Sequence, residues 1–311
     1  MTPKLVPASF FGMVLGLSGL GQAWRLAAGY WGLPGLVAET LLTLAGLVWL
    51  SLLLRYLWQA LRHPQARLAE WQHPVQGGTP ALLGIATLLM VLAILPYSRS
   101  LAWCLTALGL GWHLAFALWH TGTLWQGRRQ SQDTAPTLYL PTVAGNFTSA
   151  AALGALGQHQ WGWLFLGAGV FSWLALESPI LQRLWQAEDL PAAQRPLLGI
   201  QFAPPAVCLM ASLMLQPGQA TPWLLMLWGY ALFQLLLGLR LWRWLGTQRF
   251  APSYWAYTFG IAATTVGTLK LAQAGAAPAQ ALALPVFLAA NGFIGYLSLR
   301  TGYRLLRGRL L

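Results

Sequence analysis

The sequence predicts an all-α integral membrane protein in which ten transmembrane helices form five helical hairpins. Of its 311 residues, 57% are hydrophobic and only 8% are charged, a balance outside the range of soluble globular domains. Mostly apolar stretches of about 20 residues, the length that crosses ~30 Å of hydrocarbon, recur ten times between short polar breaks. These breaks are too short for a soluble domain, so residues 1–311 are expected to form one transmembrane domain.

The first apolar stretch begins the series and is expected to remain in the mature chain. Lys4 is the one positive charge near it, and no clear small-residue cleavage site follows it, so a signal peptide is not indicated. Nine further stretches of similar length follow. The ten predicted spans are residues 9–28, 35–61, 80–97, 101–125, 138–157, 161–184, 193–216, 222–245, 252–274 and 281–304.

The distribution of the 18 basic residues predicts the orientation in the membrane. Only Arg25, Arg99 and Lys270 fall at the side opposite the N-terminus. Because basic residues concentrate on the cytoplasmic side of membrane proteins, we expect both termini to lie in the cytoplasm. The expected location is the inner membrane of the cell. The net charge of +12 then reflects topology and contact with anionic lipid headgroups, and no nucleic-acid partner is expected. The other fifteen basic residues are Lys4, Arg55, Arg62, Arg67, Arg128, Arg129, Arg183, Arg195, Arg240, Arg243, Arg249, Arg300, Arg304, Arg307 and Arg309.

Composition alternates between odd-numbered and even-numbered spans. Trp occurs 13 times in the even spans and twice in the odd spans, and Leu occurs 39 against 21 times. Helices around a central pathway need small residues, whereas helices of an outer ring contact lipid. The alternation predicts a pseudo-fivefold arrangement in which the odd helices line a pore and the even helices face lipid.

Ionisable groups inside the spans indicate what such a pore would carry. Glu177 is the only acid well inside a span, and it belongs to an outer helix, where a structural ion pair is expected. A cation pore usually carries acidic rings, and the predicted inner ring has no acid. Arg25, Arg99 and Lys270 would give the external mouth a positive bias, so small anions are the expected cargo.

Four segments resemble the tellurite-resistance/dicarboxylate transporter family, to which the plant guard-cell slow anion channels are related. They are PASFFGMVLGLSGLGQAWR, LYLPTVAGNFTSAAALGALG, GIQFAPPAVCLMAS and YWAYTFGIAATT. The resemblance implies five helical hairpins, a pore within each protomer, a homotrimer, and an aromatic plug on the ninth helix. The matching residue here is Phe259, which Gly260 follows.

The same match suggests which residues line the pore. Asn146 and the threonines offer neutral donors to a partly dehydrated anion, although Asn146 is equally suited to a hydrogen bond between helices. Pro204 kinks a helix, and freed carbonyls are tolerated where they line a cavity. The expected lining residues are Gly12, Gly16, Gly145, Asn146, Thr148, Pro204, Thr258 and Gly260.

The sequence therefore predicts passive conduction of small inorganic or organic anions through a pore gated by Phe259. Two alternatives remain: a proton-coupled carrier or exporter of tellurite or C4-dicarboxylates, with Glu177 as its protonatable group, and a haem-bearing membrane anchor with His113 and His120 on one helix face. No GxSxG or HExxH motif occurs, so catalysis is not expected, and neither is a cofactor or a metal.

Overall fold

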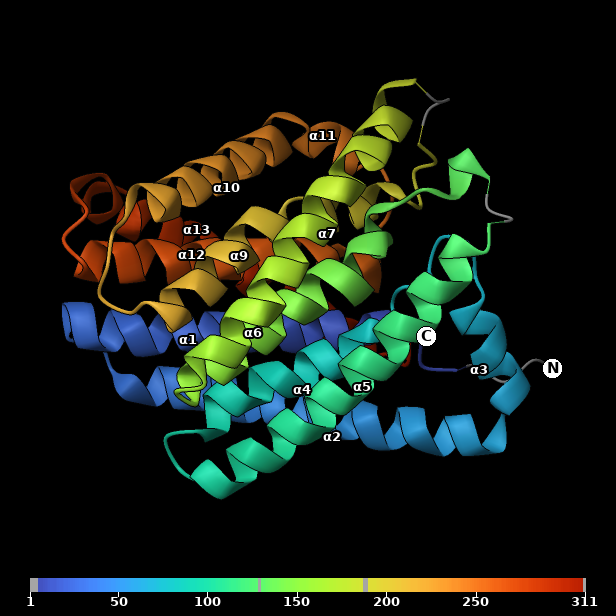
Figure 1. Ribbon diagram of the computed structural model, residues 1–311, viewed down its shortest axis with the longest axis horizontal. Coiled ribbons are helices and arrows are strands. Elements are labelled where there is room, and N and C mark those ends of the chain that lie inside the picture. Colours follow the sequence, from blue (N-terminus) through green and yellow to red (C-terminus); the bar gives the residue numbers. More distant parts are fainter. Residues whose placement is uncertain (1–4, 128–129, 187–189, 310–311) are drawn as a thin grey trace.

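The computed structural model describes residues 5–127, 130–186 and 190–309, and within these ranges the chain is helical with no strand (Figure 1). Lys4, Arg128 and Arg129, which were counted for the orientation, lie outside the described residues. The helices are α1 (Gly12–Trp31), α2 (Gly35–Arg62), α3 (Pro64–Trp71), α4 (Ala81–Ile94), α5 (Arg99–Trp125), α6 (Gly145–Ala155), α7 (His159–Gln186), α8 (Leu198–Gln201), α9 (Ala203–Leu215), α10 (Pro222–Arg240), α11 (Trp242–Leu245), α12 (Ala256–Gln273) and α13 (Ala277–Leu306).

Several helices are long and apolar enough to cross a membrane, as expected of a multi-pass membrane protein. Six helical segments in the described ranges meet this requirement, namely α2, α5, α7, α10, α13 and residues Arg195–Leu215, which include α8 and α9. Helix α4 is apolar but shorter. The remaining predicted spans coincide with α1, α6 and α12, and the short helix α3 lies in a stretch that the sequence analysis treated as a polar break.

Burial divides the long helices into two groups. In the most apolar window of α2, α5, α7, α10 and α13, only 17–33% of residues are buried, whereas 89% are buried in the window within Arg195–Leu215. All residues of α4 from Ala81 to Ala93 are buried, and most of α1, α6 and α12 is buried as well. As a group, the odd-numbered spans with few Trp and Leu are therefore the buried ones, as the composition predicts, although the exposed helix α13 also lacks Trp.

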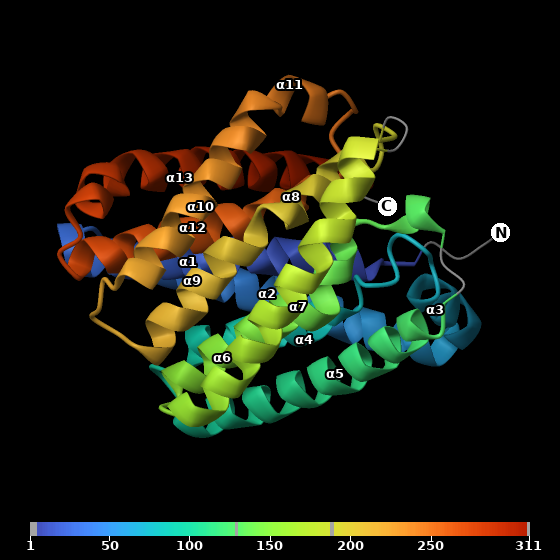
Figure 2. The same cartoon turned by 45° about the horizontal axis from the view of Figure 1, so that its top comes forward.

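The buried helices contact one another in a closed cycle. Helix α1 contacts α4, α4 contacts α6, α6 contacts α9, α9 contacts α12, and α12 returns to α1. Each of them also packs against the exposed helix that follows it in the chain, which is α2, α5, α7, α10 or α13. Figures 1 and 2 show α1 and α12, from opposite ends of the sequence, side by side in both views.

Two of the buried segments are interrupted where proline occurs. Residues Leu140–Ala144 form a π-helical turn that contains Pro141 and leads into α6. A turn at Phe202 separates α8 from α9, two residues before Pro204. Proline lacks the backbone N–H that a continuous helix needs, so both interruptions follow from the sequence.

Glycine allows α1 and α12 to approach closely. A Cβ atom on Gly16 would lie 2.4 Å from Thr258 Oγ1 and 2.7 Å from Thr258 Cβ. We expect Gly16→Ala to reduce the free energy of unfolding by about 1–3 kcal/mol, the usual cost of overpacking a tight core. Gly46→Ala on α2, where nothing lies within 4 Å of the added atom, is the matched control. An equal loss of thermal stability in the two purified variants would contradict the proposed steric role of Gly16.

Candidate functional site

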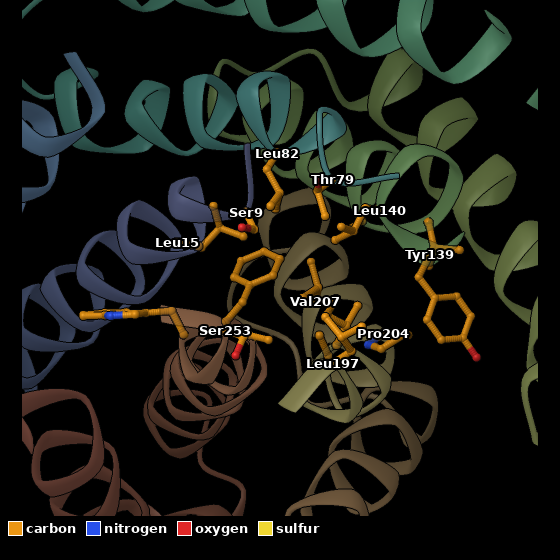
Figure 3. A pocket seen from close by; sticks show the side chains of 18 of the residues that line it. Ser9, Leu15, Thr79, Leu82, Tyr139, Leu140, Leu197, Pro204, Val207 and Ser253 are labelled. Carbon is orange, nitrogen blue, oxygen red and sulfur yellow. The ribbon is translucent and has the colours of Figure 1, made fainter. Parts of the chain in front are cut away.

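A cavity of about 80 Å³ lies among the N-terminal ends of the five buried helical segments. Its lining residues come from the first turns of each segment or from the turns just before them. Figure 3 shows Leu15, Leu82 and Val207 converging on this cavity from three different helices. The residues that line it include Ser9, Gly12, Leu15, Gln76, Thr79, Leu82, Tyr139, Leu140, Val143, Ala144, Phe147, Pro204, Val207, Ser253, Ala256 and Phe259.

The cavity is apolar at its inner end and polar at its rim. Val207, Phe147 and Phe259 are 1%, 0% and 6% exposed, whereas Gln76 at the rim is exposed and Ser9 is half-buried. No acidic or basic side chain lines it among the described residues. The N-terminal end of a helix carries a partial positive charge, so the backbone contributes a positive potential where the side chains contribute none.

Phe259 is the fourth residue of α12, and its side chain forms part of the cavity wall. Gly260 beside it lies against the turn between α8 and α9: an added Cβ atom would be 3.2 Å from the Phe202 carbonyl group and 3.2 Å from Ala203 Cα. The absence of a side chain at Gly260 therefore allows two backbones to approach, and it holds α12 close to the segment that carries Pro204.

Three of the residues expected at the pore, Gly12, Pro204 and Phe259, line this cavity, and the other six do not. Gly16 meets Thr258, as described above, and the Thr258 hydroxyl donates to Trp255 O at 2.7 Å. The Thr148 hydroxyl donates in the same way to Ala144 O at 2.9 Å. Hydroxyls that bond to their own helix are satisfied without a ligand, so these residues serve helix packing.

Gly145 and Asn146 face the outer helix α5. An added Cβ atom on Gly145 would lie 2.2 Å from His113 Nδ1, and Asn146 Oδ1 lies 3.0 Å from His113 Nε2. Asn146 also donates to Thr142 O at 2.6 Å. Of the two roles open to Asn146, the structure shows the hydrogen bond between helices. His113 is 2% exposed, and its Nε2 atom is engaged by Asn146. The contact with Asn146 accounts for the buried histidine without a haem.

The sequence analysis missed the apolar wall residues Leu15, Leu82, Val143 and Val207. One regularity would have found some of them, because residues three or four apart share a helix face. Leu15 follows Gly12 by three positions and Val207 follows Pro204 by three. On the fifth span, the lining residues Leu140, Val143, Ala144 and Phe147 form one such face.

The basic residues expected at the external mouth have different surroundings. Arg25 forms an ion pair with Glu39, with both nitrogen–oxygen distances 2.7 Å, and also donates to Leu92 O and Ala93 O. Arg99 donates to Leu156 O at 3.0 Å. Lys270 is half-buried and forms no ion pair with the described residues. Glu39 therefore neutralises the charge of Arg25. This ion pair was not predicted from the sequence.

Glu177 has neutral partners, so the ion pair expected from the sequence does not occur among the described residues. Its carboxylate accepts hydrogen bonds from Tyr139 Oη at 2.6 Å, Trp173 Nε1 at 2.7 Å, Gln201 Nε2 at 3.0 Å and Tyr230 Oη at 3.3 Å. Figure 3 shows the Tyr139 hydroxyl pointing away from the cavity. Glu177 thus lies behind the cavity wall and joins four segments of the structure.

The all-helical architecture, with several long apolar helices packed around a buried core, defines a class of multi-pass membrane proteins. A family model described as "SLAC1: Voltage-dependent anion channel" matches residues 6–301. The chain therefore belongs to this SLAC1/TehA family, which confirms the resemblance seen in the sequence.

Named relatives come from a bacterium and a plant. A protein of Haemophilus influenzae named "Tellurite resistance protein TehA homolog" is 32% identical over 99% of this chain and 93% of its own length. The Arabidopsis thaliana S-type anion channel SLAH2 is 28% identical over 85% of this chain and 52% of its own length. The guard cell S-type anion channel SLAC1 of the same plant is 22% identical over 95% and 55%. The chain thus spans about half the length of these plant proteins.

Proposed function

We propose that this protein is a passive channel for small anions, with a pore through the ring of α1, α4, α6, α9 and α12 that Phe259 closes. The observation that supports the proposal is the cavity: residues from all five ring segments line it, and the buried Phe259 side chain is part of its wall. The ring of contacts and the following exposed helices support a pseudo-fivefold set of hairpins in one transmembrane domain. The names of the relatives support anions as the cargo.

Electrostatics favour anions over cations in this cavity. No carboxylate faces it among the described residues, and five helix N-termini surround it. Their partial charges attract an anion without binding it tightly, as rapid conduction requires. With both termini in the cytoplasm of a cell and the protein in its inner membrane, the cavity opens on the basic cytoplasmic side. At the opposite side, Lys270, which has no ion-pair partner among the described residues, is the proposed source of positive potential.

We expect Phe259 to close the pathway by two effects, its volume and its exclusion of water. A phenyl ring occupies volume, and an apolar constriction also excludes water, so an ion must give up hydration to pass. Gly12 and Pro204 line the pathway beside it, while the close contacts of Gly16, Gly145 and Gly260 hold the ring helices in place. By the family resemblance, the functional unit is a homotrimer in which each protomer carries its own pore and contacts lipid through the exposed helices.

A proton-coupled carrier of tellurite or dicarboxylates is the second candidate, because Glu177 is an acid in a span with no cationic partner among the described residues. Flux of chloride and of malate from proteoliposomes separates the two. A channel follows the imposed voltage without saturating, whereas a carrier saturates and responds to a proton gradient.

Glu177→Gln sharpens this distinction. Glutamine keeps an acceptor for the surrounding donors but cannot exchange a proton, so we expect voltage-driven chloride flux to change by less than about twofold. Gel filtration of the purified variant checks that it remains folded. Loss of a proton-driven flux in Glu177→Gln, with the wild type showing such a flux, would favour the carrier over the channel.

A further inference from the structure

We propose that the cavity below Phe259 is a binding site for short aliphatic monocarboxylates, such as hexanoate, that enter from the cytoplasmic side and block the pathway. The inference rests on the proposed function only in taking this cavity as the entrance to a pathway. The site itself is argued from the size, walls and rim of the cavity. No cargo ion is required for it.

Size and shape select the body of the ligand. At about 10–15 Å³ for each water-sized sphere, the volume of about 80 Å³ accommodates roughly six such spheres. A six-carbon chain fits this space better than a single halide does. The wall at the inner end consists of Leu15, Leu82, Val143, Val207 and Phe259, which are all apolar and buried. An alkyl chain displaces poorly bonded water there, which is favourable.

The rim selects the charge of the ligand. The Thr79 hydroxyl donates a hydrogen bond to Gln76 O at 2.8 Å. The side-chain amide of Gln76 and the Ser9 hydroxyl both border the cavity, and neither has a hydrogen-bond partner among the described residues. Both offer donors to a carboxylate, and the N-termini of the ring helices favour negative charge. No acidic side chain among the described residues lines the cavity to oppose it.

The two halves of the ligand therefore bind to different parts of the cavity. The carboxylate rests at the rim, as a small anion would, while the alkyl chain packs against Phe259. Moving the apolar chain back into water costs free energy in proportion to its buried area, so the molecule stays where a chloride ion would leave. Occupancy keeps the Phe259 side chain from moving toward the cavity, and the expected consequence is block from the cytoplasmic side.

Binding is measured directly, by saturation-transfer NMR of hexanoate with the protein in nanodiscs and empty nanodiscs as background. We expect saturation of hexanoate but not of hexylammonium, which has the same chain and the opposite charge, nor of acetate, which lacks the chain. Ala256→Phe, which fills the cavity from a half-buried position, should abolish the hexanoate response. Ala274→Phe, a half-buried position at the other end of α12, should retain it.

A second variant tests the rim without touching the core. Gln76→Glu places a negative charge at an exposed rim position and should weaken hexanoate binding about fivefold, whereas Gln72→Glu, exposed at the end of α3, should not. Equal saturation by hexylammonium, or an unchanged response in Ala256→Phe, would overturn the inference. Hexanoate binding in a protein that conducts no anions would leave this site standing and refute the channel, whereas anion currents without hexanoate binding would do the reverse.

Discussion

Phe259→Ala is expected to convert a closed protein into a constitutively conducting one. Truncation removes a buried ring from the wall of the cavity and, with it, the apolar constriction that we propose there. A barrier lowered by only 1.4 kcal/mol gives about tenfold more current, so we expect at least about tenfold over background. Voltage-clamp recordings with chloride, nitrate and malate substituted in turn measure both the conductance and its selectivity for anions.

Phe287→Ala on α13 is the matched control for this variant. Phe287 is 4% exposed and packs against Trp24 and Trp31, with ring centroids 5.1 and 5.4 Å away. The Phe287→Ala variant therefore loses a buried phenyl ring of the same size, but away from the cavity. Phe147 is also buried but would be an unsuitable control because it lines the cavity. Background current in a well-expressed Phe259→Ala protein, or equal current in Phe287→Ala, would remove Phe259 as the gate.

Arg67→Ala is expected to cause the largest loss of stability. Arg67 is 4% exposed and donates to Glu70 Oε2 at 2.7 Å, to Gln59 Oε1 at 2.6 Å and to Val6 O at 3.0 Å. Its guanidinium group also lies 3.9 Å from the centre of the Tyr56 ring. Removing one partner of a buried ion pair costs about 3–5 kcal/mol, because the other charge stays buried without compensation.

The consequence should reach the cavity rim through the N-terminal segment. Glu70 Oε1 accepts from the backbone of Ala8 at 2.7 Å, and the next residue, Ser9, borders the cavity. We expect the apparent melting temperature of the purified Arg67→Ala protein to fall by about 5–10 °C. Arg62→Ala, which loses an exposed arginine above the Trp58 ring, should change it little. Equal shifts in the two variants would show that the buried contacts of Arg67 add no stability.

The family of the protein and the burial of its helices could be predicted from the sequence. Summed over the odd-numbered and even-numbered spans, the content of Trp and Leu distinguished the buried group from the exposed group. Resemblance to known segments predicted that Phe259 gates a pore and that Gly12 and Pro204 line it, and the structure brings these three residues together at one cavity. The extra helix α3 was missed because its eight residues are too few and too polar to stand out between apolar spans.

The partners of individual side chains could not be predicted. Glu177 was expected in an ion pair, but its partners are neutral donors. Arg25 was expected to contribute positive charge at the external mouth, but it pairs with Glu39. These contacts join different helices, and the sequence of one helix does not determine how it is rotated relative to another. The same holds for Gly16, which meets Thr258 from the opposite end of the chain.

By itself, the sequence determined that the chain is helical, apolar and divided into exposed and buried spans, because each of these properties depends on the composition of single segments. The tertiary structure alone decided which face of each buried helix borders the cavity. Buried helices such as α4 are apolar on every side, so their own sequence favours no particular rotation. Rotation is set instead by close contacts between distant segments, where a glycine either admits a neighbouring side chain or leaves space for a cavity.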